Sequence, residues 1–245
     1  QEAQKTLALP FLLGGDLPQR AFGVEFQHLL RSRYFNLTSG VGYFDIYGNL
    51  GIKLGFPMSP PFFNRTIDLD TRHFNVYTYA NIGLLNNVTL TIGSSFDYLD
   101  RRNVALSDDS VRQFNPKVGV TWNLLPSTTA RVSVSRAVKR TLITDQTLEP
   151  TQVAGFNQFF DELNGTKSWR YGAAIDHKFT KNLFAGVESS MRDLNIPLLD
   201  STVTPETIHD FDGKEYLSRA YLFWTPHPWW ALRTEYQFEG YRNKA

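Results

Sequence analysis

Hydrophobic and polar residues alternate through most of the chain, in segments about ten to thirteen residues long. Because successive side chains of a strand point to opposite faces, this alternation predicts β-strands with one apolar and one polar face. Strands of soluble proteins are usually about 5–6 residues long, whereas a tilted strand that crosses a bilayer needs about 9–11. The predicted strands are 4–13, 20–30, 33–46, 72–83, 88–99, 112–124, 130–139, 168–179, 182–193, 214–225 and 230–241.

The connections between these strands are alternately short and long from residue 20 onward. The short ones are 31–32, 84–87, 125–129, 180–181 and 226–229, and the long ones are 47–71, 100–111, 140–167 and 194–213. Outer-membrane barrels combine short periplasmic turns with longer extracellular loops. The chain is therefore predicted to be all-β, an antiparallel transmembrane β-barrel. Residues 50–56 could form a twelfth strand, which would reverse the sidedness of every later loop.

The two faces of the predicted strands differ in chemistry. In 112–124, Val118 and Trp122 share a face with other apolar residues, while Lys117 lies on the opposite, polar face. An apolar face opposite a charged one fits lipid outside the barrel and water inside it. We therefore expect an arginine in place of Val118 to be costly, and replacement of Lys117 by alanine to be mild.

Aromatic residues recur on the apolar faces at a constant spacing of eight residues. The pairs are Phe35 and Tyr43, Phe114 and Trp122, Tyr171 and Phe179, Tyr216 and Trp224, and Trp230 and Phe238. Eight residues span about 26 Å of strand, or about 20 Å at a tilt near 40°, close to the ~25 Å apolar band between two aromatic girdles. Aromatic core residues of a β-sandwich are the alternative, which the constant spacing disfavours. The predicted girdle residues are Trp122, Trp224, Trp229, Trp230, Phe114, Tyr171 and Phe238.

Charged residues of both signs occupy the predicted inner face. Those expected to line the lumen are Lys117, Arg131, Arg170, Asp176, Glu188, Arg192, Arg233 and Glu235. They can pair as a solvated ladder, or line a pore and hold a plug, and the sequence leaves both open. Loops 140–167 and 194–213 are expected to carry the substrate contacts, with Phe156, Phe159 and Phe160 as apolar candidates.

The amino-acid composition argues against several classes of protein. The 25 Lys and Arg nearly balance the 24 Asp and Glu, whereas nucleic-acid binders usually carry a basic surplus. Cysteine is absent, which excludes disulfides and thiolate chemistry. The five histidines lack metal-ligand spacing, so no catalytic residue, metal or cofactor is predicted. An outer-membrane hydrolase stays a disfavoured alternative because no Ser/His or Asp/His constellation stands out.

One stretch of the chain resembles a known family. Residues 114–122, a short turn and residues 129–136 resemble a hairpin of TonB-dependent receptor barrels, and the Leu-Glu-Pro element at 148–150 and the strand beginning 168–172 fit the same family. Residues 152–160 also resemble the C-terminal barrel of tetratricopeptide-repeat outer-membrane proteins. The resemblance covers about residues 110–193 and implies a bacterial outer-membrane location. Energy-coupled uptake is implied by this resemblance alone.

These observations favour a transport barrel. Residues 1–245 are expected to form one domain, a porin-like passage or a receptor for a solute or an exported polymer. The alternative is a structural barrel that anchors a periplasmic repeat domain or partner proteins. Single-chain bacterial barrels have an even number of strands, and unpaired strand edges do not survive in lipid. We therefore expect further strands or a partner chain to complete the barrel, with outer-membrane lipid around it.

Overall fold

The structure, a computed structural model, describes residues 12–16, 18–55, 63–103, 109–140, 146–158, 162–200 and 207–243. Their regular elements are all β-strands. None of the described residues forms a helix that is both long and apolar enough to cross a membrane.

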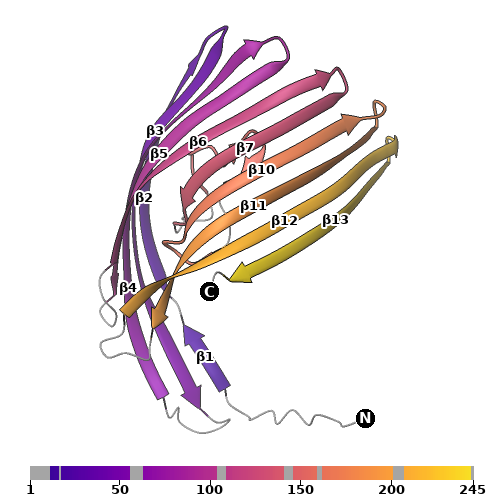
Figure 1. The fold of residues 1–245 in the computed structure, drawn as a ribbon. Coiled ribbons are helices and arrows are strands. Elements are labelled where there is room, and N and C mark those ends of the chain that lie inside the picture. The colour runs from indigo at the N-terminus through magenta and orange to yellow at the C-terminus, as the bar shows by residue number, and fades with distance from the viewer. Residues whose placement is uncertain are drawn as a thin grey trace, which may run out of the picture.

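The long strands form one open, curved antiparallel sheet, with β2 near one edge and β13 at the other (Figure 1). Neighbours along the sheet follow chain order, and β8 and β9 pair only with each other as a small separate hairpin. The strands are β1 (Leu12–Asp16), β2 (Gln19–Arg31), β3 (Phe35–Gly55), β4 (Phe63–Leu85), β5 (Val88–Asn103), β6 (Asp109–Leu125), β7 (Thr128–Val138), β8 (Gln152–Val153), β9 (Phe156–Asn157), β10 (Lys167–Lys178), β11 (Leu183–Asp200), β12 (Thr207–His227) and β13 (Trp230–Asn243).

Every predicted strand from 20–30 onward coincides with an observed one, which confirms the all-β, antiparallel fold. The predicted strand 4–13 lies outside the described residues except for Leu12 and Leu13, which belong to β1. The sheet contains eleven strands, as predicted, but they do not all lie side by side. Within the described ranges, β1 and β2 follow one another along the same side of β3. The sheet is thus ten strands wide.

Three of the predicted long connections are mostly strand. β3 continues to Gly55 and β4 begins at Phe63, so residues 50–55 extend β3 and do not form a twelfth strand. Likewise β5 and β6 reach into 100–111, and β11 and β12 into 194–213. Residues 50–55 keep the alternation that made them a possible strand, whereas 194–200 contain a proline and two adjacent leucines that break it. Backbone pairing continues through both stretches, and in the second Asn195 Nδ2 donates to Asp212 Oδ1 at 3.1 Å. The connection between β7 and β10 stays long.

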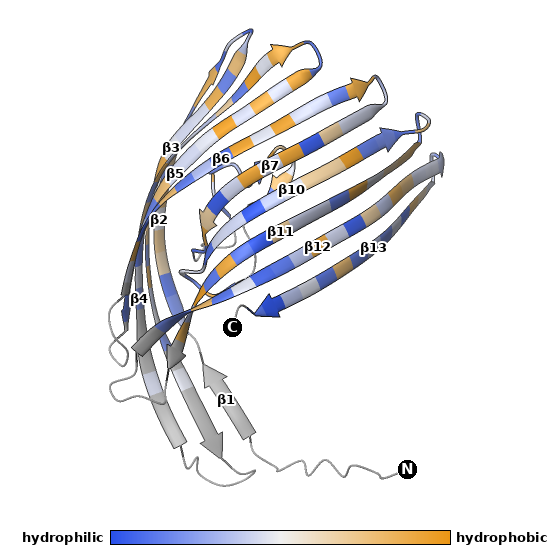
Figure 2. Ribbon diagram, in the orientation of Figure 1, coloured by the Kyte–Doolittle hydropathy of each residue, from blue (hydrophilic) through white to orange (hydrophobic). Residues whose placement is uncertain are grey.

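The outer face of the sheet is apolar and the inner face is polar, the reverse of a soluble domain. Figure 2 shows hydropathy alternating along the strands. On β6, Phe114, Val118 and Trp122 are 57%, 48% and 48% exposed, whereas Asn115 and Lys117 are 0% and 1% exposed. All ten aromatic residues of the eight-residue pairs are exposed. Exposed apolar area on this scale is typical of a surface that contacts lipid.

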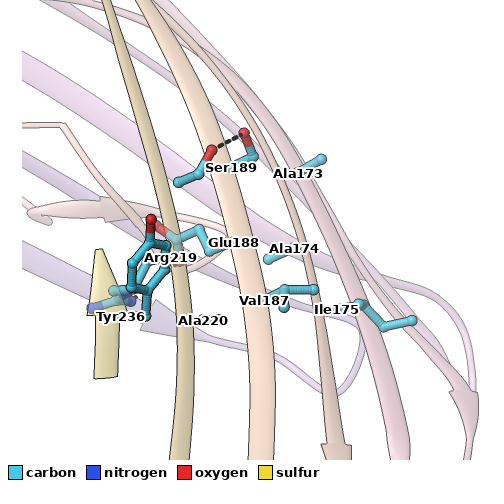
Figure 3. Close-up of a pocket in the computed structure, with 10 residues that line it drawn as sticks. Ala173, Ala174, Ile175, Val187, Glu188, Ser189, Arg219, Ala220 and Tyr236 are labelled. Atoms are coloured by element: carbon cyan, nitrogen blue, oxygen red, sulfur yellow. Dashed lines mark hydrogen bonds and ion pairs between the residues drawn. The ribbon is translucent and has the colours of Figure 1, made fainter. Parts of the chain in front are cut away.

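Small side chains interrupt the outer face across β10, β11 and β12. Ala173, Ser189 and Ala220 line a hollow of about 570 Å³ there (Figure 3). The hydroxyl groups of Ser189 and Ser218 hydrogen-bond to each other at 2.9 Å. This pairing lets two polar groups lie on an apolar face, because neither hydroxyl is left without a partner.

Candidate functional site

The long connection between β7 and β10 folds back onto the concave face of the sheet (Figure 1). We call its described residues 146–158 the inner segment. β8 and β9 form a tight hairpin within it, whose turn residues Ala154 and Gly155 have φ of 48° and 83°. Two positive φ values are typical of the two-residue turns that join antiparallel strands. The hairpin residues Val153 and Phe156 are 0% and 1% exposed.

Glu149 anchors the first half of the inner segment. Its carboxylate accepts hydrogen bonds from Tyr79 Oη at 2.6 Å and from Asn75 Nδ2 at 3.1 Å, both on β4. Arg140 Nη2 lies 2.7 Å from the same carboxylate and Lys117 Nζ lies 3.9 Å from it. Glu149 is the only charged residue of the inner segment, and two cations meet it: Lys117 on β6 and Arg140, two residues beyond the end of β7.

Asp97 on β5 is the second buried carboxylate of this site. It lies 2.8 Å from His73 Nε2 and 3.3 Å from Arg140 Nη1, and it accepts a hydrogen bond from Asn115 Nδ2 at 2.6 Å. Lys117 donates to Ser95 Oγ at 2.9 Å. Arg140 thus bridges Asp97 and Glu149.

The pKa of Arg140 reflects this bridging position. Burial alone would lower the pKa of the guanidinium, but the carboxylates of Glu149 and Asp97 outweigh that effect and raise the pKa above its usual value. The buried cations and anions therefore balance, as charges that are removed from water require. The residues of this charged cluster are His73, Asn75, Tyr79, Asp97, Asn115, Lys117, Arg140 and Glu149.

The inner segment also reaches across to β2. Glu25 accepts hydrogen bonds from Thr147 Oγ1 at 2.6 Å and from the Leu148 backbone nitrogen at 2.9 Å, and Gln27 donates to the Leu148 carbonyl. The segment therefore links β2, at the edge of the sheet, to the wall formed by β4, β5 and β6.

The hairpin is seated on β6, β7 and β10. Two guanidinium groups contact the Phe156 ring, with Arg131 Cζ 5.3 Å and Arg170 Cζ 5.6 Å from the ring centroid. Two glycines make room beneath it. A Cβ at Gly119 would lie 2.7 Å from Ala154 Cβ, and one at Gly172 would lie 2.5 Å from the Phe156 ring. A glycine inside a strand often marks such a close approach.

The remaining inner-face charges form a ladder across β7 and β10–β13. The Glu188 carboxylate pairs with three arginines, with guanidinium nitrogens of Arg131, Arg170 and Arg219 lying 3.4–3.6 Å from its oxygens. The ladder continues through the pairs Arg131–Asp176, Arg219–Glu235, Arg233–Glu235, Arg192–Glu215 and Arg192–Glu162. All eight predicted lumen residues lie on the inner face and have an oppositely charged neighbour. Their role in lining a pore stays a prediction.

The other predicted site residues fall in three places. Phe156 is buried against the chain's own strands, while Phe159 and Phe160 lie outside the described residues. The seven predicted girdle residues are exposed, and their contact with lipid stays a prediction; they are Trp122, Trp224, Trp229, Trp230, Phe114, Tyr171 and Phe238.

Sequence reasoning missed most of the charged cluster. Arg140 falls in a connection, and Glu149 stands out only within the Leu-Glu-Pro element of the resemblance. The expectation that Lys117 faces water is wrong, because the inner segment covers it and its side chain is 1% exposed. The inward glycines Gly119 and Gly172 are the local sign of a close approach, but they do not tell which loop folds inward.

The curved sheet, with its apolar outer face and charged inner face, defines part of the wall of a transmembrane β-barrel. The family model for the TonB dependent receptor-like β-barrel matches residues 3–187, and the chain belongs to this family. The family is one of bacterial outer-membrane proteins, which confirms the predicted location. The match extends the resemblance from residue 110 back to residue 3 and ends at residue 187.

Solved structures share the fold. The pyoverdine receptor FpvA of Pseudomonas aeruginosa and the ferric yersiniabactin uptake receptor FyuA of Yersinia pestis are each 11% identical, with a TM-score of 0.67, and each match covers 96% of this chain and 37% of that one. The copper transporter OprC is 12% identical, with a TM-score of 0.65, over 94% of this chain and 38% of that one. The chain thus spans little more than a third of these receptors. No curated protein matches the sequence.

Proposed function

We propose that this chain forms part of the wall of an outer-membrane barrel that admits a solute as a receptor or transporter. The observation that carries the proposal is the paired, buried charge of the inner face. A passage for a hydrophilic solute requires a polar interior, and the receptor and the transporter that share this fold add the second support. The same proposal includes two roles: the girdle residues contact lipid, and the lumen residues line the passage.

The first class of solute to test is a metal ion or metal complex. FyuA is described as a ferric yersiniabactin uptake receptor and OprC as a copper transporter, and this chain has their fold. Barrels of this type with a plugged lumen have about 22 strands. The ten-strand sheet would then be about half of such a wall, with other sequence or a partner chain supplying the rest and a plug.

A deletion of the complete gene tests the proposal. Uptake of labelled iron and copper complexes is measured in the parent, in the deletion strain and in the complemented strain, with and without a protonophore. We expect the deletion strain to lose uptake of at least one complex, and complementation to restore it. Energy coupling predicts that the protonophore abolishes the same uptake.

The alternative functions give different results in the same strains. Export of a polymer predicts normal metal uptake and loss of a surface polymer. An anchoring barrel predicts normal uptake and displacement of partner proteins from the outer membrane. Unchanged uptake of every complex tested would contradict metal transport and leave these two functions to be separated.

A further inference from the structure

The inner segment is attached to the wall at three places, spread over seven neighbouring strands. In sheet order these strands are β2, β3, β4, β5, β6, β7 and β10. Glu25 and Gln27 hold the start of the segment to β2, and Glu149 is hydrogen-bonded to β4. The hairpin is held to β7 and β10, where Arg131 and Arg170 donate to its backbone carbonyls. One short stretch of chain therefore connects strands that are six pairing steps apart.

Backbone pairing alone does not fix the curvature of these strands. Each of them pairs only with its immediate neighbours in the sheet, so small rotations can accumulate from one pair to the next. Strand number and stagger set the mean width of a closed barrel, but an arc within that barrel can be flatter or more bent. Six pairing steps cover about 29 Å of wall at ~4.8 Å per step. A segment attached at both ends and in the middle of this arc does fix its bend.

Glycines on the inner face coincide with the attachments. A Cβ at Gly40 of β3 would clash with the Tyr77 ring, and one at Gly93 of β5 would lie 2.7 Å from the Tyr79 ring. Glycine kinks are a device that builds curvature into a sheet. Tyr79 also holds the inner segment, because its hydroxyl donates to Glu149 at 2.6 Å. The side chain that fills the space at a bend of the wall is thus one that fastens the segment.

We propose that the inner segment is a curvature brace, which holds the arc from β2 to β10 at one fixed bend. Its attachments are shielded from water, since Glu149, Val153 and Phe156 are at most 2% exposed. The brace stays seated against the wall while the protein works. It gives the edge strand β2 a fixed position, against which the rest of the barrel can pair. The inference goes beyond the proposed function, because it concerns the wall and holds for any solute.

Distances across the outer face report the bend. One row of directly paired residues crosses this face from β2 to β10: Leu30, Leu37, Ala80, Ile92, Val118, Val134 and Tyr171. Nitroxide labels are placed on the complete protein in bilayers, either at Leu30 and Val118 (the β2–β6 pair) or at Ala80 and Tyr171 (the β4–β10 pair). The labels of each pair are separated by about 19 Å of wall. Double electron–electron resonance gives the mean and the width of each distance distribution.

Two variants loosen opposite ends of the brace. Glu25→Ala with Gln27→Ala removes the attachment to β2, and Phe156→Ala removes the ring that seats the hairpin near β10. We expect the first variant to lengthen and broaden the distance of the β2–β6 pair and to leave the β4–β10 pair unchanged. We expect the reverse from Phe156→Ala.

A matched control comes from the opposite edge of the sheet. Gln237 donates to Glu239 on β13, so Gln237→Ala with Glu239→Ala also removes an amide and a carboxylate from an edge strand. This control should change neither distance. Wild-type distributions in the two brace variants would overturn the proposal. Equal broadening of both label pairs in each variant would also overturn it, because that result reports a general loosening of the barrel.

Heat-dependent migration on gels identifies the folded variants. Thr147→Val, which removes the hydroxyl that Glu25 accepts, and Phe156→Leu are the milder replacements for a variant that does not fold, and the same two outcomes decide. Failure of the proposed function looks different, because no solute enters these measurements. A braced arc in a protein whose deletion leaves metal uptake unchanged would refute metal transport and keep the brace.

Discussion

An arginine at Val118 probes the lipid-facing assignment at its most sensitive depth. Val118 lies on the outer face of β6, four residues from Phe114 and four from Trp122, and is 48% exposed. Four residues span about 13 Å of strand, so Val118 lies midway between the two aromatic positions, near the bilayer midplane. An arginine there should cost about 2–4 kcal/mol, falling to about 0–1 kcal/mol near the interface.

Leu124→Arg is the matched control, because Leu124 shares the outer face of β6 but lies beside the turn at 126–127. The assay is denaturant titration of the complete protein folding into bilayers. Val118→Arg should lower the folding equilibrium constant by about 30- to 900-fold, and Leu124→Arg by about fivefold or less. Equal costs at the two positions, or a larger cost at Leu124, would refute the assigned depth and face.

Three further predictions concern the interior. Lys117→Ala should destabilise the folded barrel by about 1–3 kcal/mol in the same titration, because a buried cation leaves Ser95 and Glu149; no measurable change would contradict its burial. Glu149→Gln leaves the buried cations in excess and should lower the free energy of unfolding by about 3–5 kcal/mol. Adding Lys117→Met should recover part of that loss. Additive effects of the two substitutions in this double-mutant cycle would mean that the two residues do not interact. A broad-specificity protease added to intact cells should not cut within residues 146–158, and mass spectrometry of the fragments checks this; cleavage there in folded protein would place the segment outside the barrel.

Strands and faces are readable from this sequence because each residue reports the side on which it lies. Phe114, Val118 and Trp122 are apolar because they point outward, and Lys117 between them is charged because it points inward. The strand ends could not be placed in the same way. Residues 194–200 read Leu-Asn-Ile-Pro-Leu-Leu-Asp, in which a proline and two adjacent leucines break the alternation, although the backbone pairing continues through them.

The inner segment could not be predicted because its contacts are non-local. Glu149 meets Tyr79 and Asn75, which lie 70 and 74 residues away along the chain, and no periodicity records such a pairing. Its polar composition is also that of an ordinary exposed loop. Gly119 and Gly172 carried a signal, since two inward glycines on neighbouring parts of a wall indicate a close approach. Their meaning depends on knowing which loop lies above them.

The central claim is that the two faces of this sheet meet lipid and a covered polar interior. Nitroxide labels placed singly at Lys117, Val118 and Val120 of the complete protein in bilayers test it most directly. Collision with oxygen, which concentrates in lipid, is compared with collision with a water-soluble nickel chelate. The account predicts high oxygen access at Val118 and Val120, and low access to both reagents at Lys117 beneath the inner segment. Equal oxygen access at all three positions, or higher access at Lys117, would contradict it.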